Sequence, residues 1–198
     1  MTARIMAAAF VTTSLIVAQT GCGKPFNVKR KVDLPFSAQK AQQQVGDVTV
    51  QADAIRDENL IHDTFDANLI MADVLPVQLR IENHNASPLS VKGFKLELQD
   101  ESGHDRKRLS ARATFKRLVS YYEMTTYNKY GYKRSQEDLV SYEFDWDEPI
   151  GAGAGRSGLL FFQITPEDRR AHLVLLLRFR GPDKLEQTAR LELRSNGG

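Results

Sequence analysis

The chain has 198 residues, of which 41% are hydrophobic, and this suits one domain of ordinary size with its own core. A formal net charge of +2 is nearly balanced, so the whole-chain charge says little about partners; the charge is instead segregated along the chain. The single cysteine, Cys22, excludes an intramolecular disulfide.

The first 21 residues have the features of a secretory signal. One early positive charge, Arg4, precedes an apolar run over residues 5–18. This run has the length of a signal core, about 7 to 15 residues, and is shorter than the about 20 residues that span a bilayer. We therefore expect residues 1–21 to be a signal peptide and not a membrane helix.

The signal ends with a small residue followed by the cysteine, Gly21 and then Cys22. This pattern resembles the signal of bacterial lipoproteins, in which the cysteine is lipidated and becomes the mature N-terminus. The resemblance implies acylation of Cys22 and anchoring in a lipid bilayer. Because Gly23 is not Asp, it also implies sorting to the periplasmic face of an outer membrane. The alternatives are ordinary secretion with an incidental cysteine, or a cytosolic protein.

Residues 22–44 contain two prolines and scattered hydrophobic residues without a sustained period, which predicts a lipid-anchored tether. Its basic residues would lie near anionic headgroups, where each can add up to about 1 kcal/mol of attraction. The alternative is a solvated linker whose charges have no specific role. The basic residues are Lys24, Lys29, Arg30 and Lys31.

The span 45–196 is expected to form the domain, because strand-like runs follow one another along it. Alternating or continuous apolar runs separated by turn residues predict an antiparallel β-sandwich. Pro76 predicts that its strand lies at a sheet edge or begins one residue later. The expected strands cover residues 47–55, 74–83, 92–100, 157–164, 172–179 and 188–194. The expected core includes Leu79, Ile81, Leu96, Phe162 and Leu175.

Two stretches resemble the immunoglobulin-like domain of uncharacterised bacterial lipoproteins: "FDANLIMADVLPVQLRIENHN" over residues 65–85 and "GLLFFQITPED" over residues 158–168. The shared features are "LPV" entering a long strand that ends in Asn, and a glycine leading into an "FF" strand followed by Pro. The resemblance implies a mainly β, antiparallel immunoglobulin-like β-sandwich with an envelope location, and it implies no activity.

Residues 105–134 form an insertion that a minimal sandwich does not need. Apolar residues at helical spacing between residues 109 and 130 predict that the insertion is helical, with one face packed on the sheet. The insertion is rich in Arg, Lys and Tyr, whereas residues 47–73 and 137–148 on either side are acidic. One interpretation is internal neutralisation, in which the acidic segments fold against the basic helix.

The other interpretation is a docking surface for an anionic partner, since Arg pairs with phosphate or carboxylate and Tyr supplies rigid contact area. The partner would be an envelope protein, an anionic glycan or a lipid; nucleic acid is disfavoured outside the cytoplasm. The residues expected to bind the partner are Arg112, Lys116, Arg117, Tyr121 and Tyr127.

No catalytic motif is recognisable. The glycine-rich "GAGAGRSG" at residues 151–158 precedes an apolar strand and lacks the lysine of a phosphate loop, which predicts a flexible interstrand loop. The four histidines lie far apart in the sequence, without ligand spacing. We expect no cofactor, no metal and no enzymatic activity. The sequence therefore predicts a membrane-anchored envelope lipoprotein that acts as a binding or scaffold module; the alternative is a hydrolase acting on envelope polymers.

Overall fold

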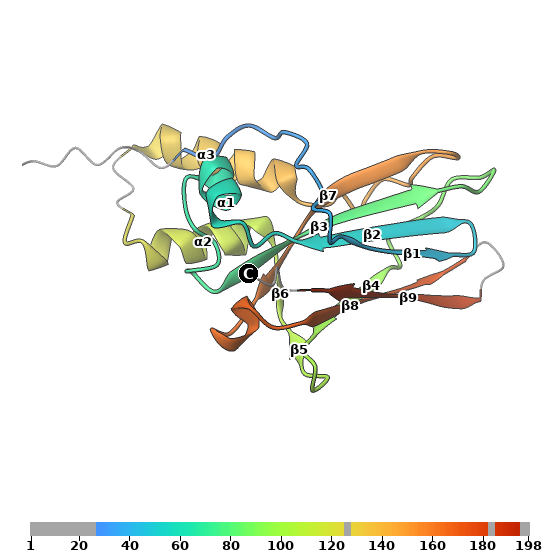
Figure 1. The fold of residues 1–198 in the computed structure, drawn as a ribbon. Helices are drawn as coiled ribbons and strands as arrows, with labels where there is room; N and C mark the ends of the chain where they lie inside the picture. The colour runs from blue at the N-terminus through green and yellow to red at the C-terminus, as the bar shows by residue number, and fades with distance from the viewer. Residues whose placement is uncertain (1–26, 125–127, 182–184, 195–198) are drawn as a thin grey trace, which may run out of the picture.

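The computed structural model describes residues 27–124, 128–181 and 185–194, which fold into two antiparallel sheets and three α-helices (Figure 1). The first sheet has the strand order β1-β2-β3-β7-β6 and the second the order β5-β4-β8-β9. The first contains β1 (Ala41–Val45), β2 (Val48–Ala54), β3 (Val74–Asn83), β7 (Gly155–Gln163) and β6 (Arg108–Leu109). The second contains β5 (Asp105–Arg106), β4 (Lys95–Gln99), β8 (Leu173–Arg180) and β9 (Glu186–Leu193). The mainly β prediction is confirmed, and the two sheets are consistent with a β-sandwich.

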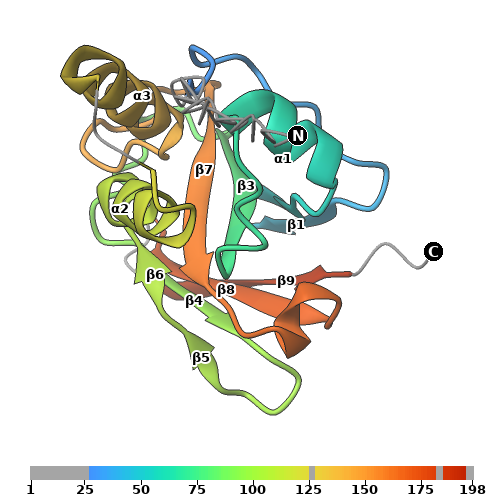
Figure 2. The ribbon, with the colours of Figure 1, turned by 90° about the vertical axis from the view of Figure 1, so that its left-hand side faces the viewer.

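The core lies between the two sheets (Figure 2). Val48, Val50 and Ala52 of β2 are buried in the core as expected, but Thr49 and Asp53 on the other face of the strand are buried as well. Four of the five predicted core residues have no exposed surface, and the fifth, Leu96, is only partly buried. Leu96 lies on the part of β4 that β5 does not cover, because β5 pairs only with Leu98 and Gln99.

Both alternatives predicted from Pro76 are wrong: β3 lies between β2 and β7 and not at an edge, and it begins at Val74, before the proline. The strand nevertheless contains Pro76. The carbonyl oxygen of Pro76 accepts a hydrogen bond from Ile55 N at 2.9 Å, just beyond the last β2–β3 pair, Ala54 with Val77. In a strand the nitrogen and the carbonyl of one residue face the same neighbour, so the nitrogen of Pro76 faces β2 and not β7. Pairing with β2 ends at this position, so the missing N–H of the proline costs no hydrogen bond to β7.

The helices are α1 (Glu58–Phe65), α2 (Ala111–Tyr121) and α3 (Lys129–Tyr142), and they gather at one end of the molecule (Figure 1). Side-chain caps start all three, from Asp57, Ser110 and Asn128. The predicted helical insertion is present, but it contains two helices and extends to residue 142, and residues 105–109 form the short strands β5 and β6. A backbone of φ 49° at Glu123 follows α2, which explains why a single helix does not continue to residue 130.

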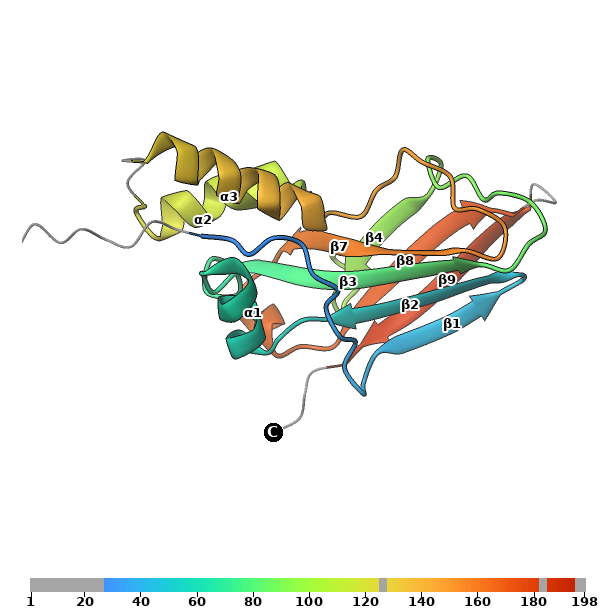
Figure 3. The same ribbon diagram turned by 90° about the horizontal axis from the view of Figure 1, so that it is seen from above.

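The N-terminal segment was expected to be a tether up to residue 44, and this is wrong for the part that the structure describes. Residues 41–45 form strand β1, and the preceding segment crosses the outer face of the first sheet (Figure 3). Gln78 on β3 donates to Leu34 O at 2.7 Å, and Asp53 on β2 accepts hydrogen bonds from Ser37. We call residues 27–40 the strap.

The chain between α3 and β7 passes closely over β7 at Gly158. Phe144 N donates to Leu159 O at 3.0 Å, and a β-carbon at Gly158 would lie 2.4 Å from Phe144 Cα. The flexible loop predicted for residues 151–158 is therefore limited to residues 151–154, because β7 begins at residue 155. None of the helices that the structure describes is long and apolar enough to cross a membrane.

Candidate binding surface

Helices α2 and α3 form a hairpin whose inner faces are apolar. Phe115 of α2 packs edge-to-face against Tyr132 of α3, with ring centroids 4.9 Å apart, and Leu118 and Leu139 are fully buried beside them. The hairpin therefore has a fixed inner face, and part of its remaining surface is exposed.

Two of the predicted binding residues lie on this exposed part. Arg112 and Lys116 are both exposed, and their spacing of four residues places them on one side of α2. Neither forms an ion pair with another residue that the structure describes. Their charges are therefore available to a partner.

The third predicted cation, Arg117, points towards the body of the protein. Its Nε donates to Ala72 O at 2.6 Å, and its guanidinium lies 3.2 Å from a carboxylate oxygen of Asp73. Arg169 pairs with the other oxygen of Asp73 at 3.0 Å. Arg117 therefore joins α2 to the segment before β3 and is not free for a partner.

The charge of Arg106 is also neutralised inside the protein. Its guanidinium forms two hydrogen bonds with the buried Asp168, at 2.6 and 2.8 Å, and one with Asp100 at 2.7 Å. Burial raises the pKa of Asp168, but the hydrogen bonds from Arg106 and from Thr165 lower it by more than burial raises it. The pKa of Asp168 is therefore below its ordinary value. This cluster joins β5 to the 3-10 turn at Glu167–Arg169.

Other cations of the insertion have partners as well. Arg108 lies 3.9 Å from Glu143 and over the ring of Trp146, while Lys133 and Arg134 are each paired with an acid one turn later on α3. The acidic flanks thus neutralise part of the insertion, as one of the two interpretations predicts, and leave another part without partners.

The tyrosines divide in the same way. Tyr132 packs in the hairpin, whereas Tyr121 is 48% exposed and Tyr130 is 89% exposed. Tyr122 is partly exposed, and its hydroxyl exchanges two hydrogen bonds with the backbone of Asn68. Tyr127, the fifth predicted binding residue, lies outside the described residues.

These exposed groups lie along the α2–α3 hairpin: Arg112 is in the first turn of α2, whereas Tyr121, Lys129 and Tyr130 lie where α2 ends and α3 begins. We call them the basic–tyrosine surface: Arg112, Lys116, Tyr121, Tyr122, Lys129 and Tyr130. The sequence drew attention to Tyr122, Lys129 and Tyr130 as members of the insertion but not as binding residues, because helical spacing alone does not show which tyrosines pack and which project.

The strap begins beside this surface. Asn27 N donates to Asp66 Oδ2 at 2.9 Å, and Asp66 is only two residues from Asn68, the partner of Tyr122. Val28 is buried, and its N–H bonds to Ser135 of α3. Cys22, the predicted lipidation site, and the signal peptide lie outside the described residues.

A cavity of about 200 Å³ lies between the strap and the outer face of β3 and β7. Gln78 lines it and is 4% exposed; its Nε2 binds Leu34 O, but its Oε1 accepts no hydrogen bond in the structure. The sequence did not indicate Gln78, because a polar residue on alternate positions of a strand is the pattern of a solvated face.

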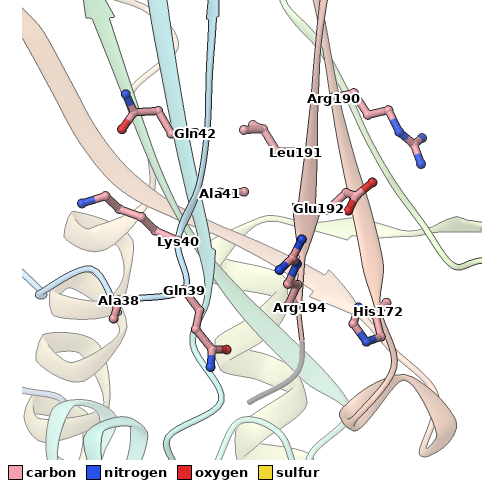
Figure 4. Close-up of a pocket in the computed structure, with 10 residues that line it drawn as sticks. All are labelled: Ala38, Gln39, Lys40, Ala41, Gln42, His172, Arg190, Leu191, Glu192 and Arg194. Atoms are coloured by element: carbon pink, nitrogen blue, oxygen red, sulfur yellow. The ribbon is translucent and has the colours of Figure 1, made fainter. Parts of the chain in front are cut away.

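Two open clefts lie at the edge of the second sheet. One, of about 520 Å³, lies between β1 and β9, and its side chains do not converge: in Figure 4 Lys40 points to one side and Arg190 and Glu192 to the other. The other, of about 450 Å³, is lined by Asp100, Glu101 and Glu192 among others.

One carboxylate of the second cleft, Asp100, is held in its ionised form by neighbouring donors. The pKa of Asp100 is lowered to about 2, first by the hydrogen bond from His104 N and then by Arg106, so Asp100 stays ionised. Across residues 27–124, 128–181 and 185–194, no three His, Cys, Asp or Glu side chains are grouped to hold a metal ion.

The comparisons with known proteins do not assign the chain to a family. No protein-family model and no curated protein sequence matches it. Among solved structures, one match is the crystal structure of a DUF4426 family protein from Pseudomonas aeruginosa, at 11% sequence identity and a TM-score of 0.34, covering 80% of this chain and 98% of that chain. A similarity at this level assigns neither family nor function, so the functional argument rests on the residues of this chain.

Proposed function

We propose that the protein is a lipid-anchored envelope lipoprotein that acts as a non-catalytic binding or scaffold module and docks an anionic partner through the basic–tyrosine surface. The observation that carries the proposal is the division of the insertion's charges. Arg106 and Arg117 are neutralised inside the protein, whereas Arg112 and Lys116 remain exposed without partners among the described residues.

The anchor is part of the same proposal. Acylated Cys22 would hold the protein in the bilayer at the periplasmic face of an outer membrane, and two or three acyl chains give essentially permanent attachment. The immunoglobulin-like arrangement of the sandwich also belongs to the proposal; two antiparallel sheets that enclose one core support it.

The alternative of a hydrolase acting on envelope polymers has no observation in its favour. Its best location would be the cleft beside Asp100, where the low pKa of that residue suits a permanent ion pair with Arg106 and not proton donation.

The experiment that tests the anchor compares wild type with Cys22→Ala in metabolic labelling with a fatty acid, followed by membrane fractionation. We expect Cys22→Ala to lose the label and to leave the membrane fraction. Intact-mass data showing that wild type keeps residues 1–21, or carries an unmodified Cys22, would contradict the proposal.

The docking part is tested by charge reversal at the two exposed positions. Arg112→Glu with Lys116→Glu should leave the melting temperature nearly unchanged, because exposed charges contribute little to stability. The same variant should lose binding to phosphatidylglycerol vesicles, to purified anionic envelope glycan or to a crosslinked envelope protein. Loss of stability with unchanged binding in all three assays would favour internal neutralisation.

A further inference from the structure

We infer that the partner of the basic–tyrosine surface is the anionic headgroup layer of the same bilayer that holds Cys22, so that the protein lies with its helical end on the membrane. The inference rests on the proposed lipid anchor and deepens it, because it names the partner and the orientation. Two observations carry it: where the strap begins, and how charge is distributed over the helical end.

The strap fixes how far the helical end can be from the bilayer. Four residues lie between Cys22 and Asn27, and the five extended residue-to-residue steps from Cys22 to Asn27 span at most about 18 Å. The backbone N–H of Asn27 donates to the carboxylate of Asp66. Two residues after Asp66, the backbone of Asn68 forms hydrogen bonds with the hydroxyl of Tyr122. An acylated Cys22 therefore holds this end of the molecule close to the headgroups.

Charge selects which side of the helical end meets the bilayer. The exposed side of α2 and the start of α3 carry Arg112, Lys116 and Lys129. The exposed acids Asp57 and Glu58 begin α1, and Glu58 lies at the Tyr122 edge of the surface, because its carboxylate accepts a hydrogen bond from the side chain of Asn68. The attraction of an anionic leaflet for basic side chains acts within about one Debye length, roughly 10 Å, so the exposed cations of α2 and α3 are drawn to the membrane and the acidic start of α1 turns away from it.

The strap carries further exposed cations near the helical end. Lys29, Arg30 and Lys31 are exposed and follow the buried Val28. The carbonyl of Arg30 accepts a hydrogen bond from Tyr142 Oη at 3.0 Å, which holds this part of the strap against the end of α3. The strap therefore adds cations beside the C-terminal end of α3, and Lys129 supplies another at its N-terminal end.

The aromatic residues suit the same location. Tyrosine is enriched at membrane interfaces because its ring is apolar and its hydroxyl is polar. Tyr121 and Tyr130 expose their rings at the end of the hairpin, and Met71 is exposed on the segment that Tyr122 contacts. The loops at the opposite end of the sheets then face away from the bilayer (Figure 3).

The test is amine acylation of the protein as the cell makes it, reconstituted in vesicles and read by peptide mass spectrometry. An anionic leaflet concentrates protons at its headgroups by roughly three- to sevenfold, which lowers the unprotonated, reactive fraction of a nearby lysine by the same factor. We expect Lys116 and Lys129 to react about three- to sevenfold more slowly on phosphatidylglycerol vesicles than on phosphatidylcholine vesicles.

The chain supplies its own control in Lys92 and Lys95, which are exposed near the opposite end of the sheets. Their reactivity should be the same on both vesicles, and 1 M salt should remove the protection of Lys116. The Cys22 peptide, measured in the same digest, shows whether the lipid is present, so failure of the anchor is distinguished from failure of the docking.

Two outcomes would overturn the inference. One is that Lys116 and Lys129 react equally on both vesicles while Cys22 carries lipid. The other is that they are protected only when envelope protein or glycan is added, which would assign the surface to that partner.

A further variant, Tyr121→Ala with Tyr130→Ala, should reduce the protection on anionic vesicles without changing its dependence on salt. An unchanged protection would also contradict the proposed contact.

Discussion

Replacement of Gly158 by alanine tests the closest backbone approach in the fold. The added β-carbon would lie 2.4 Å from Phe144 Cα, 2.8 Å from its nitrogen and 2.9 Å from its Cβ, and all three distances are shorter than real contacts. Two of these atoms are backbone, so no side-chain rotation relieves the clash. Phe144 is buried and packs against Trp146 at 4.4 Å between ring centroids, so displacing it also disturbs that contact.

Overpacking of this kind costs about 1 to 3 kcal/mol, and we expect the upper part of that range because backbone must move. For a chain of this size each kcal/mol lowers the melting temperature by about 2 to 4 °C, so Gly158→Ala should melt roughly 6 to 12 °C below wild type. Gly93→Ala is the matched control, because no atom lies within 4 Å of the added carbon, and it should change stability by less than about 0.5 kcal/mol. Equal melting temperatures of Gly158→Ala and wild type would refute the described crossing of residues 143–144 over β7.

Three further predictions concern the polar contacts. The pKa of Asp168 is lowered in the folded protein, so its contribution to stability is complete above its ordinary pKa of 3.8 and is lost as pH falls further. Asp168→Asn should cost about 3 kcal/mol in urea unfolding at pH 7 and flatten the acid dependence; an unchanged acid dependence would show that the Arg106 pair is not formed. Gln78→Leu removes the bond to the strap and should cost about 1 kcal/mol and speed proteolysis before residue 41, whereas unchanged proteolysis would mean that this bond does not hold the strap. Arg117→Glu should cost about 2 kcal/mol or more because it places a second carboxylate beside Asp73, and equal stability with Arg112→Glu would contradict the distinction between them.

The strands were predictable because their side chains alternate with the period of a sheet. Val48, Val50 and Ala52 mark β2, and the apolar runs of β7 and β8 mark strands with neighbours on both sides. Strand β1 escaped prediction because "AQQQV" carries no apolar alternation, and it is held by pairing with β2. Helix α1 was missed because it is only eight residues long, so its caps and its contacts with the core decide its formation more than its periodicity.

The binding surface was predictable only as a composition. The sequence showed that Arg, Lys and Tyr concentrate in residues 105–134, but it could not separate Arg112 from Arg117, which lie five residues apart on the same helix. Their difference depends on Asp73 and Ala72, which the fold brings from more than 40 residues away. A pairing at that separation leaves no local signal in the sequence.

The orientation of the anchored protein on the membrane tests the central claim most directly. Acylation of Cys22 would occupy the only thiol of the chain, so a fluorophore can be attached selectively at Lys116→Cys or, as control, at Lys92→Cys. In vesicles that contain phosphatidylglycerol and a headgroup-linked quencher, we predict strong quenching at position 116 and little at position 92. Equal quenching at the two positions, or stronger quenching at position 92, would contradict the account that the helical end lies on the bilayer.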